Sequence, residues 1–218
     1  RCAVCGGNNE IIHMAENAIN KESLHKSKNE ILSMSIVFHR YDITEYLVDS
    51  CGVSIEYDNW LNSILAGNYC FFLNHIIECC NEYDRLLELQ KSGRLDDVDD
   101  FKLNEFKEKV NELALIAAQN VDVFFLKVIA CFNNINLNLT GSYGLNQKKI
   151  TCPLVLAIQS RNLDNVKFLI SLESVDPDWV VVNDTTPFLW ACYIGDLEIV
   201  KLLVENFYLN KNSIKNDD

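Results

Sequence analysis

Proline and glycine are scarce in this chain, at three and eight of its 218 residues. Nine cysteines accompany them, but so few turn residues do not fit a small secreted scaffold held by disulfide bonds. The odd number of cysteines, many of them at apolar helical positions, indicates free thiols in the reducing environment of the cytoplasm. We therefore expect an intracellular, cytoplasmic protein without structural disulfides.

Basic residues are also few, with 19 Lys and Arg against 31 Asp and Glu, a net charge of −12. Non-specific binding to nucleic acid or to an anionic membrane surface needs a basic footprint, so we expect neither partner. The most apolar stretch, residues 121–132, contains Lys127 and is far shorter than the roughly 20 residues of a membrane span. The chain begins at Arg1 without a signal peptide, and we interpret it as a fragment of a longer polypeptide.

Residues 186–204 predict two helices joined by a tight turn. Pro187, directly after Thr186, fits the first turn of a helix, where its missing N–H is not needed. Gly195 can adopt the positive φ that ends a helix. An apolar stripe at helical spacing follows, formed by Leu197, Ile199, Val200, Leu202 and Leu203. Such an αα-hairpin cannot bury its own apolar faces, so the pattern predicts neighbouring copies.

One copy lies directly upstream, where residues 152–157 mirror residues 186–191 at an offset of 34 residues. The offset and the run TPFLWA resemble the ankyrin repeat family, which has a period of about 33 residues and the motif T-P-L-H-x-A. Leu189 and Val155 stand where that family has histidine. The resemblance implies a stack of αα-hairpins.

Four weaker copies are predicted upstream: a half repeat at 3–14, then 31–48, 60–77 and 112–129. The residues that correspond to Ala191 are Ala3, Ser35, Ile64, Ala117 and Ala157. Between the copies, we expect a polar connecting loop over residues 17–30 and a flexible connector at 141–144.

The predicted fold class is all-α, an ankyrin-type αα-hairpin repeat solenoid of about six repeats with an enlarged acidic helical insertion in the middle. We expect one array over 1–218, with N-terminal repeats in 1–78, the first of them truncated. The acidic insertion occupies 79–111, and the C-terminal repeats and a polar tail occupy 112–218. We interpret the insertion as a lengthened second helix, an acidic turn and a lengthened first helix.

No motif predicts catalysis, a cofactor or a metal. The Cys2-x-x-Cys5 pair lacks the second close pair of ligands that a zinc site needs. Adjacent Cys79 and Cys80 point in different directions on a helix and are interpreted as apolar fillers. The aspartates at 96–100 lack the order of a calcium loop, and an Asp at a helix N-cap explains them better. We expect a chain that is not an enzyme.

The resemblance implies a protein-binding module that contacts another protein through its concave face, its loop tips and the exposed ends of its first helices. The positions that match the family's contacts are Val182, Asn183, Thr185, Tyr193, Ile194, Lys148, Lys149, Thr151, Gln159, Ser160, Gln119 and Asn120. Tyr193 would supply an aromatic anchor and Lys148 and Lys149 two cationic rim contacts. In an alternative interpretation the array targets or regulates an enzyme or effector that lies elsewhere in a longer chain. Further repeats or domains of the same chain are then its partners.

Overall fold

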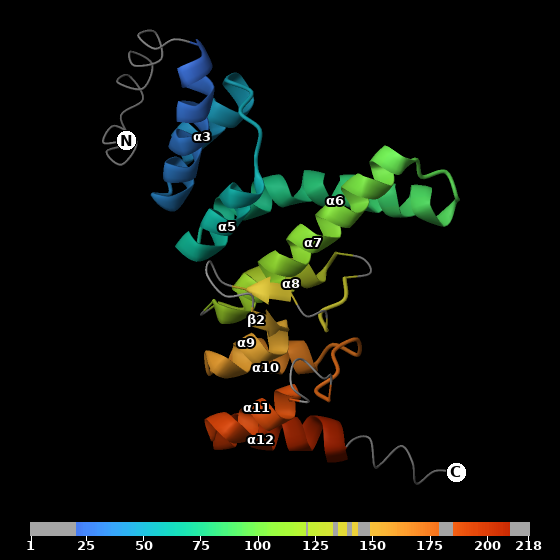
Figure 1. Cartoon of the computed structure of the whole chain (residues 1–218). Helices are drawn as coiled ribbons and strands as arrows, with labels where there is room; N and C mark the ends of the chain where they lie inside the picture. The colour runs from blue at the N-terminus through green and yellow to red at the C-terminus, as the bar shows by residue number, and fades with distance from the viewer. Residues whose placement is uncertain are drawn as a thin grey trace. The chain divides into compact units, whose positions relative to one another are not determined.

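A computed structural model describes residues 21–120, 122–132, 135–138, 141–143, 149–178 and 185–209. The chain divides into two compact units, unit 1 (Arg1–Glu82) and unit 2 (Tyr83–Asp218), and the boundary falls inside one long helix. Helices dominate both units, which confirms the all-α fold class (Figure 1). The predicted single array over 1–218 stays a prediction, as does the number of repeats.

Unit 1 is built from the helices α3 (Lys21–Val37), α4 (Tyr41–Glu45), α5 (Tyr57–Ala66) and the first part of α6 (Tyr69–Lys91). A π-helical turn, η1 (Tyr46–Ser50), extends α4. Helix α3 packs against both α4 and α5. The fully buried side chains of this unit include Leu32, Ile36, Ile43, Leu47, Ile64 and Phe72.

The start of α3 corrects one prediction. Residues 21–30 were expected to be part of a loop, because they are polar, but they are helical. They contain neither glycine nor proline, and half of them are Lys or Glu, which favour helices even where no apolar stripe is present. Residues 17–20 lie outside the described part of the chain, as does the half repeat predicted at 3–14.

Unit 2 contains three helix pairs and the end of α6 within its described residues. The pairs are α7 (Asp97–Gln119) with α8 (Phe124–Ala130), α9 (Pro153–Gln159) with α10 (Leu163–Ile170), and α11 (Pro187–Ile194) with α12 (Leu197–Leu203), which η2 (Val204–Leu209) extends. Helix α9 packs between α7 and α11, and α10 packs against α12 (Figure 1).

A short antiparallel hairpin, β1 (Gly141–Tyr143) and β2 (Lys149–Thr151), precedes α9, with Gly141 opposite Thr151. The flexible connector predicted at 141–144 is therefore wrong for residues 141–143. The interpretation rested on the glycines, which are common in loops, and short three-residue strands leave almost no alternation to detect.

The helix pairs share a residue that the repeat pattern predicts to be small and buried, here called the small-residue position. It holds Ser35, Ser63, Ala117, Ala157 and Ala191, all of them fully buried. The third copy was predicted with Ile64 at this position, which is wrong by one residue. Gly67 ends α5 in the left-handed conformation four residues after Ser63, as Gly195 does after Ala191. Because Ile64 is also fully buried, burial alone does not fix the register.

Polar side chains join successive helix pairs at the turn between their two helices. In unit 1, the Asn68 side-chain amide donates a hydrogen bond of 2.8 Å to the carbonyl of Ile36. In unit 2, the amide of buried Asn165 donates to the carbonyls of Ala118 (2.9 Å) and Asn120 (2.8 Å). These carbonyls lie at the carboxyl end of a first helix, where no intrahelical donor reaches them. The contacts therefore satisfy the helix end and fix the spacing between neighbouring pairs.

The helices α6 and α7 have 23 residues each and are joined by a turn in which Gly93 has a positive φ of 65°. The predicted Asp N-cap is confirmed at Asp96, whose carboxylate accepts a hydrogen bond of 2.7 Å from the backbone N–H of Asp99. Within unit 2, Tyr83 of α6 stacks on Phe106 of α7, with ring centroids 5.1 Å apart. This contact holds the two helices together more than two helical turns away from the turn that joins them.

Candidate functional site

The exposed carboxyl ends of the first helices are the candidate site. Each end presents the two residues that follow the small-residue position at +2 and +3, here called the helix-end positions. In unit 2 they hold Gln119, Asn120, Gln159, Ser160, Tyr193 and Ile194. Gln159 and Ser160 are exposed, and Gln119 and Asn120 are half-buried. The backbone turns at this point in each pair, and the exposed side chains among these residues are accessible to a partner.

Tyr193 is the most exposed large apolar side chain in the described residues, at 82%. Its ring meets the Trp190 ring edge to face, with centroids 5.6 Å apart and planes at 86°. Leu189, one helical turn earlier, is 51% exposed, whereas Ile194 is half-buried. An aromatic ring held by a second ring loses little conformational freedom when it is covered. The end of α11 therefore exposes an aromatic side chain that is already ordered by a neighbouring ring.

The preceding pair, α9–α10, shows which positions of α11 become buried when a neighbouring pair packs against them. Leu189 corresponds to Val155 of α9, which is 1% exposed in a helix that packs against α11. Tyr193 corresponds to Gln159, which is exposed even though its helix pair has a neighbour. Leu189 therefore lies on the face of the pair against which a following pair would stack. Tyr193 lies at a helix-end position, which stays exposed in α9 even though that helix has a neighbour on each side.

The structure places the remaining predicted contacts less favourably. Thr151 is 5% exposed, so the prediction that its side chain contacts a partner is wrong: the packing that starts α9 buries it. Thr185 is half-buried and Lys149 lies in β2. Val182, Asn183 and Lys148 lie outside the described residues. The expected pairing of Tyr193 with the two lysines stays a prediction.

Unit 1 contains contact candidates that the sequence analysis missed. Its helix-end positions hold Val37 (41% exposed), Phe38 (47%) and Leu65 (66%). The signal that could have found them is their distance from Ser35 and Ser63. For Leu65 that signal was lost, because the third copy was read one residue out of register. Apolar residues also read as core when nothing indicates which face of the helix they occupy.

Two of the described thiols, those of Cys79 and Cys152, have raised pKa values. Burial, with the neighbouring Cys80 and Glu78 adding to it, raises the pKa of the Cys79 thiol to about 11. Burial also raises the pKa of Cys152. Both thiols are therefore protonated and poorly nucleophilic near neutral pH. Cys2 and Cys5 lie outside the described residues.

Two further properties bear on what the site can do. Among the described residues, no three His, Cys, Asp or Glu side chains come close enough to hold a metal ion. None of the described helices has the length and apolar character that crossing a bilayer requires. The candidate site offers exposed aromatic and amide side chains, whose chemistry is that of contact and hydrogen bonding.

Stacked helix pairs of this size and register define a repeat protein of the αα-hairpin class. A family model for ankyrin repeats (3 copies) matches residues 104–216, just over half of the chain. The chain belongs to the ankyrin repeat family. Ankyrin repeats are generally protein–protein interaction modules, and domains built from them are typically non-catalytic. A search of curated proteins finds no match to this chain.

Proposed function

We propose that this chain is a non-enzymatic scaffold or adaptor of the cytoplasm, which binds a partner protein through the concave face and loop tips of its repeats. Tyr193 anchors the contact in unit 2. The observation that carries the proposal is its exposure of 82% at a position that stays open when a neighbouring pair is present. Tyrosine is enriched at the energetic centres of protein interfaces, because it brings apolar area and a polar tip with few rotatable bonds.

The composition of the neighbouring helix-end positions fits the rim of such a contact. Gln159 is exposed and uncharged, so its amide can hydrogen-bond to a partner's backbone without the desolvation cost of a full charge, while the exposed Ser160 hydroxyl donates to the Leu156 carbonyl and can still accept. Lys127 and Lys167 are exposed on the second helices of the same unit. A central aromatic residue with polar neighbours is the usual anatomy of a protein interface.

A specific observation also supports a second function, in which the array contacts another part of the same polypeptide. Leu189 stands at a stacking position and is 51% exposed, as expected if further repeats or another domain of the same chain cover α11. The array would then target or regulate a larger enzyme or effector. The two functions predict different occupants for the same helix: a separate protein over Tyr193, or a segment of the same polypeptide over Leu189.

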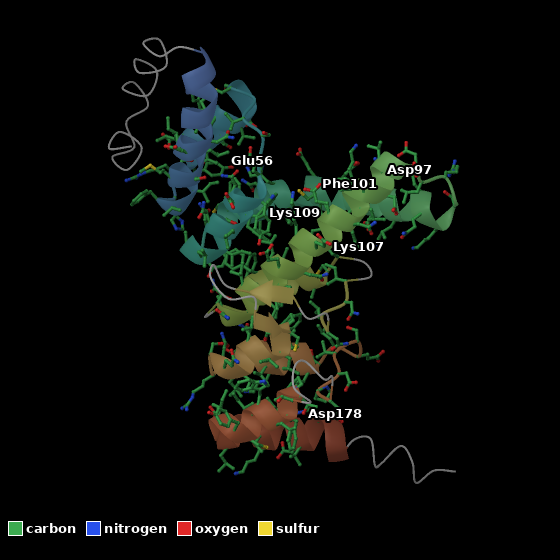
Figure 2. All side chains as sticks on the ribbon, in the orientation of Figure 1. Glu56, Asp97, Phe101, Lys107, Lys109 and Asp178 are labelled. Atoms are coloured by element: carbon green, nitrogen blue, oxygen red, sulfur yellow. The ribbon has the colours of Figure 1, made fainter. Side chains whose placement is uncertain are left out.

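Site-specific photo-cross-linking distinguishes them. A benzophenone amino acid is placed at residue 193, at residue 189 and, as a control, at Phe101, which is 70% exposed on α7 (Figure 2). The proposal predicts adducts with another protein from position 193 and few from position 101. Adducts formed only within the same polypeptide, from both 189 and 193, would support the second function. Equal yields at 193 and 101 would contradict any specific contact at Tyr193.

A further inference from the structure

Two turns of unit 1 present an unusual number of apolar side chains to solvent. They are Val37 (41% exposed), Phe38 (47%), Tyr41 (44%), Leu65 (66%) and Tyr69 (38%), here called the turn patch. All five lie within residues 37–41 and 65–69, where a first helix ends and a second helix begins. A folded surface rarely gathers so many large apolar residues in one place unless it is covered by something.

Two hydrogen bonds show that the two turns are adjacent and held together. His39 Nε2 lies 3.0 Å from the carbonyl oxygen of Ala66, next to Leu65. The Asn68 amide donates to the carbonyl of Ile36, one residue before Val37. The apolar side chains therefore form one surface across both turns, and their backbone is already ordered before any partner arrives. Such preorganisation lowers the entropy that binding must overcome.

The same positions are polar in two helix pairs of unit 2, α7–α8 and α9–α10, and hold Tyr193 and Ile194 in the third. The counterparts of Leu65 and Phe38 in the pair α9–α10 are Gln159 and Ser160, both exposed. A helix pair can thus fold with polar residues here, and the fold does not require the apolar ones. His39 also has a positive φ of 53° where Gly67 and Gly195 stand in other pairs. Its imidazole bridge to Ala66 gives a reason for a non-glycine residue at this place.

The charge of this region indicates what covers the patch. Residues 38–82 contain one basic side chain, Arg40, and seven carboxylates, so their formal charge is 1 − 7 = −6. Two of those carboxylates, Asp42 and Glu45, lie on α4 together with Tyr41, and the Tyr41 hydroxyl donates a hydrogen bond to the Glu45 carboxylate. Carboxylates beside an apolar surface, in a region of net negative charge, favour a partner with the opposite charge and disfavour a second copy of this chain or an anionic membrane.

We propose that the turn patch binds an amphipathic helix of a partner protein, with an apolar stripe that is flanked by Lys and Arg. Neighbouring packed helices lie roughly 8–10 Å apart, and residues i and i+7 of a helix are about 10.5 Å apart along its axis. A helix with apolar residues at i, i+3, i+4 and i+7 therefore reaches both turns at once. This surface extends the proposed function to unit 1 and does not depend on Tyr193.

The test uses the full chain and a labelled 18-residue peptide with Leu at i, i+3, i+4 and i+7 and Lys on the flanks. A scrambled peptide of the same composition, and a third with Glu in place of Lys, are the comparison probes. Fluorescence anisotropy gives Kd for each. The proposal predicts that the Leu–Lys peptide binds at least tenfold more tightly than either comparison probe, about 1.4 kcal/mol. Equal binding of the scrambled peptide would show mere charge attraction and overturn the proposal.

Two double variants locate the binding. Phe38→Ser with Leu65→Gln introduces the residues found at these positions in α9–α10, so the fold accommodates them. The matched control is Val98→Ser with Phe101→Ser, which removes exposed apolar side chains (62% and 70%) from α7. We expect at least tenfold weaker binding for the first and less than twofold change for the second. Equal losses of peptide affinity in the two double variants would overturn the proposal. It would also be overturned if the wild-type chain dimerised and Phe38→Ser with Leu65→Gln abolished the dimer, because a second copy would then cover the patch. Tyr193→Gln is expected to leave peptide binding unchanged.

Discussion

Arg161 and Gly195 occupy the same place in successive helix pairs, four residues after Ala157 and Ala191, and both have a positive φ, of 54° and 72°. Glycine adopts this conformation without strain, whereas a residue with a Cβ does so at a cost of roughly 1–2 kcal/mol. Gly195 therefore marks a position where the backbone must adopt a positive φ, and in the preceding repeat an arginine adopts that conformation.

We predict that Arg161→Gly increases the free energy of unfolding of unit 2 by a few tenths to about 1 kcal/mol. The substitution removes the backbone strain, and the greater conformational entropy of glycine in the unfolded chain offsets part of that gain. Urea denaturation measures the change. Ser160→Gly is the control: Ser160 is αR, with φ −78°, so glycine there should be destabilising. A loss of stability in Arg161→Gly as large as in Ser160→Gly would contradict the assigned backbone.

Ala191→Asp should destabilise unit 2 by several kcal/mol, because Ala191 is fully buried and a carboxylate there would lose its hydration. Ala191→Ser is the matched control. Serine occupies the small-residue position at Ser35 and Ser63, where each hydroxyl donates to a carbonyl three residues earlier. Serine should therefore cost about 1 kcal/mol or less. Thermal unfolding of both variants is the measurement, and similar melting temperatures would mean that the register is wrong.

Asn165→Ala should lower the free energy of unfolding by about 1–3 kcal/mol, since it leaves the Ala118 carbonyl without its donor in a buried place. Asn104→Ala removes an exposed amide of α7 that donates only to Asp100, and should change stability by less than about 0.5 kcal/mol. Chemical denaturation followed by circular dichroism compares them. If both amides contributed equally, the Asn165 contact would not join the helix pairs as described.

The Cys79 thiol should react slowly in the folded protein. Its pKa of about 11, against an ordinary 9, leaves about 100-fold less thiolate at pH 8, and the rate should rise with pH until about pH 11. Cys192, which is exposed, is the internal reference. Timed alkylation with peptide mass spectrometry measures both rates, and denaturant should make them similar. Equal rates in the native protein would contradict the burial of Cys79.

Much of the fold could be predicted from the sequence because a few residues have unambiguous backbone roles. Pro187 begins a helix and Gly195 ends one, and both were placed correctly. The third copy was read one residue out of register, since Ser63 and Ile64 are both fully buried and no proline marks the start of α5. Local signals fix a register only where a residue is restricted to one conformation.

The candidate site was predicted less completely. Tyr193 was found because its repeat has the clearest motif, and its exposure agrees with the expectation. Val37, Phe38 and Leu65 were missed because an apolar residue on a helix is interpreted as core by default. Which face is buried depends on the neighbouring pair, and that information lies about 30 residues away in the sequence. Thr151 was misplaced for the converse reason, because a polar residue is expected at the surface.

The central claim is that the helix-end position of α11 anchors a partner protein. The most direct measurement is isothermal titration calorimetry with the partner that the cross-linking identifies, purified separately in its free form. It is titrated against the wild-type chain, Tyr193→Gln and the control Phe101→Gln. Glutamine is the residue at the same position of α9, so Tyr193→Gln should fold normally. We predict that Tyr193→Gln raises Kd at least tenfold, about 1.4 kcal/mol, and that Phe101→Gln changes it less than twofold. A Kd for Tyr193→Gln within twofold of the wild-type value would contradict the claim.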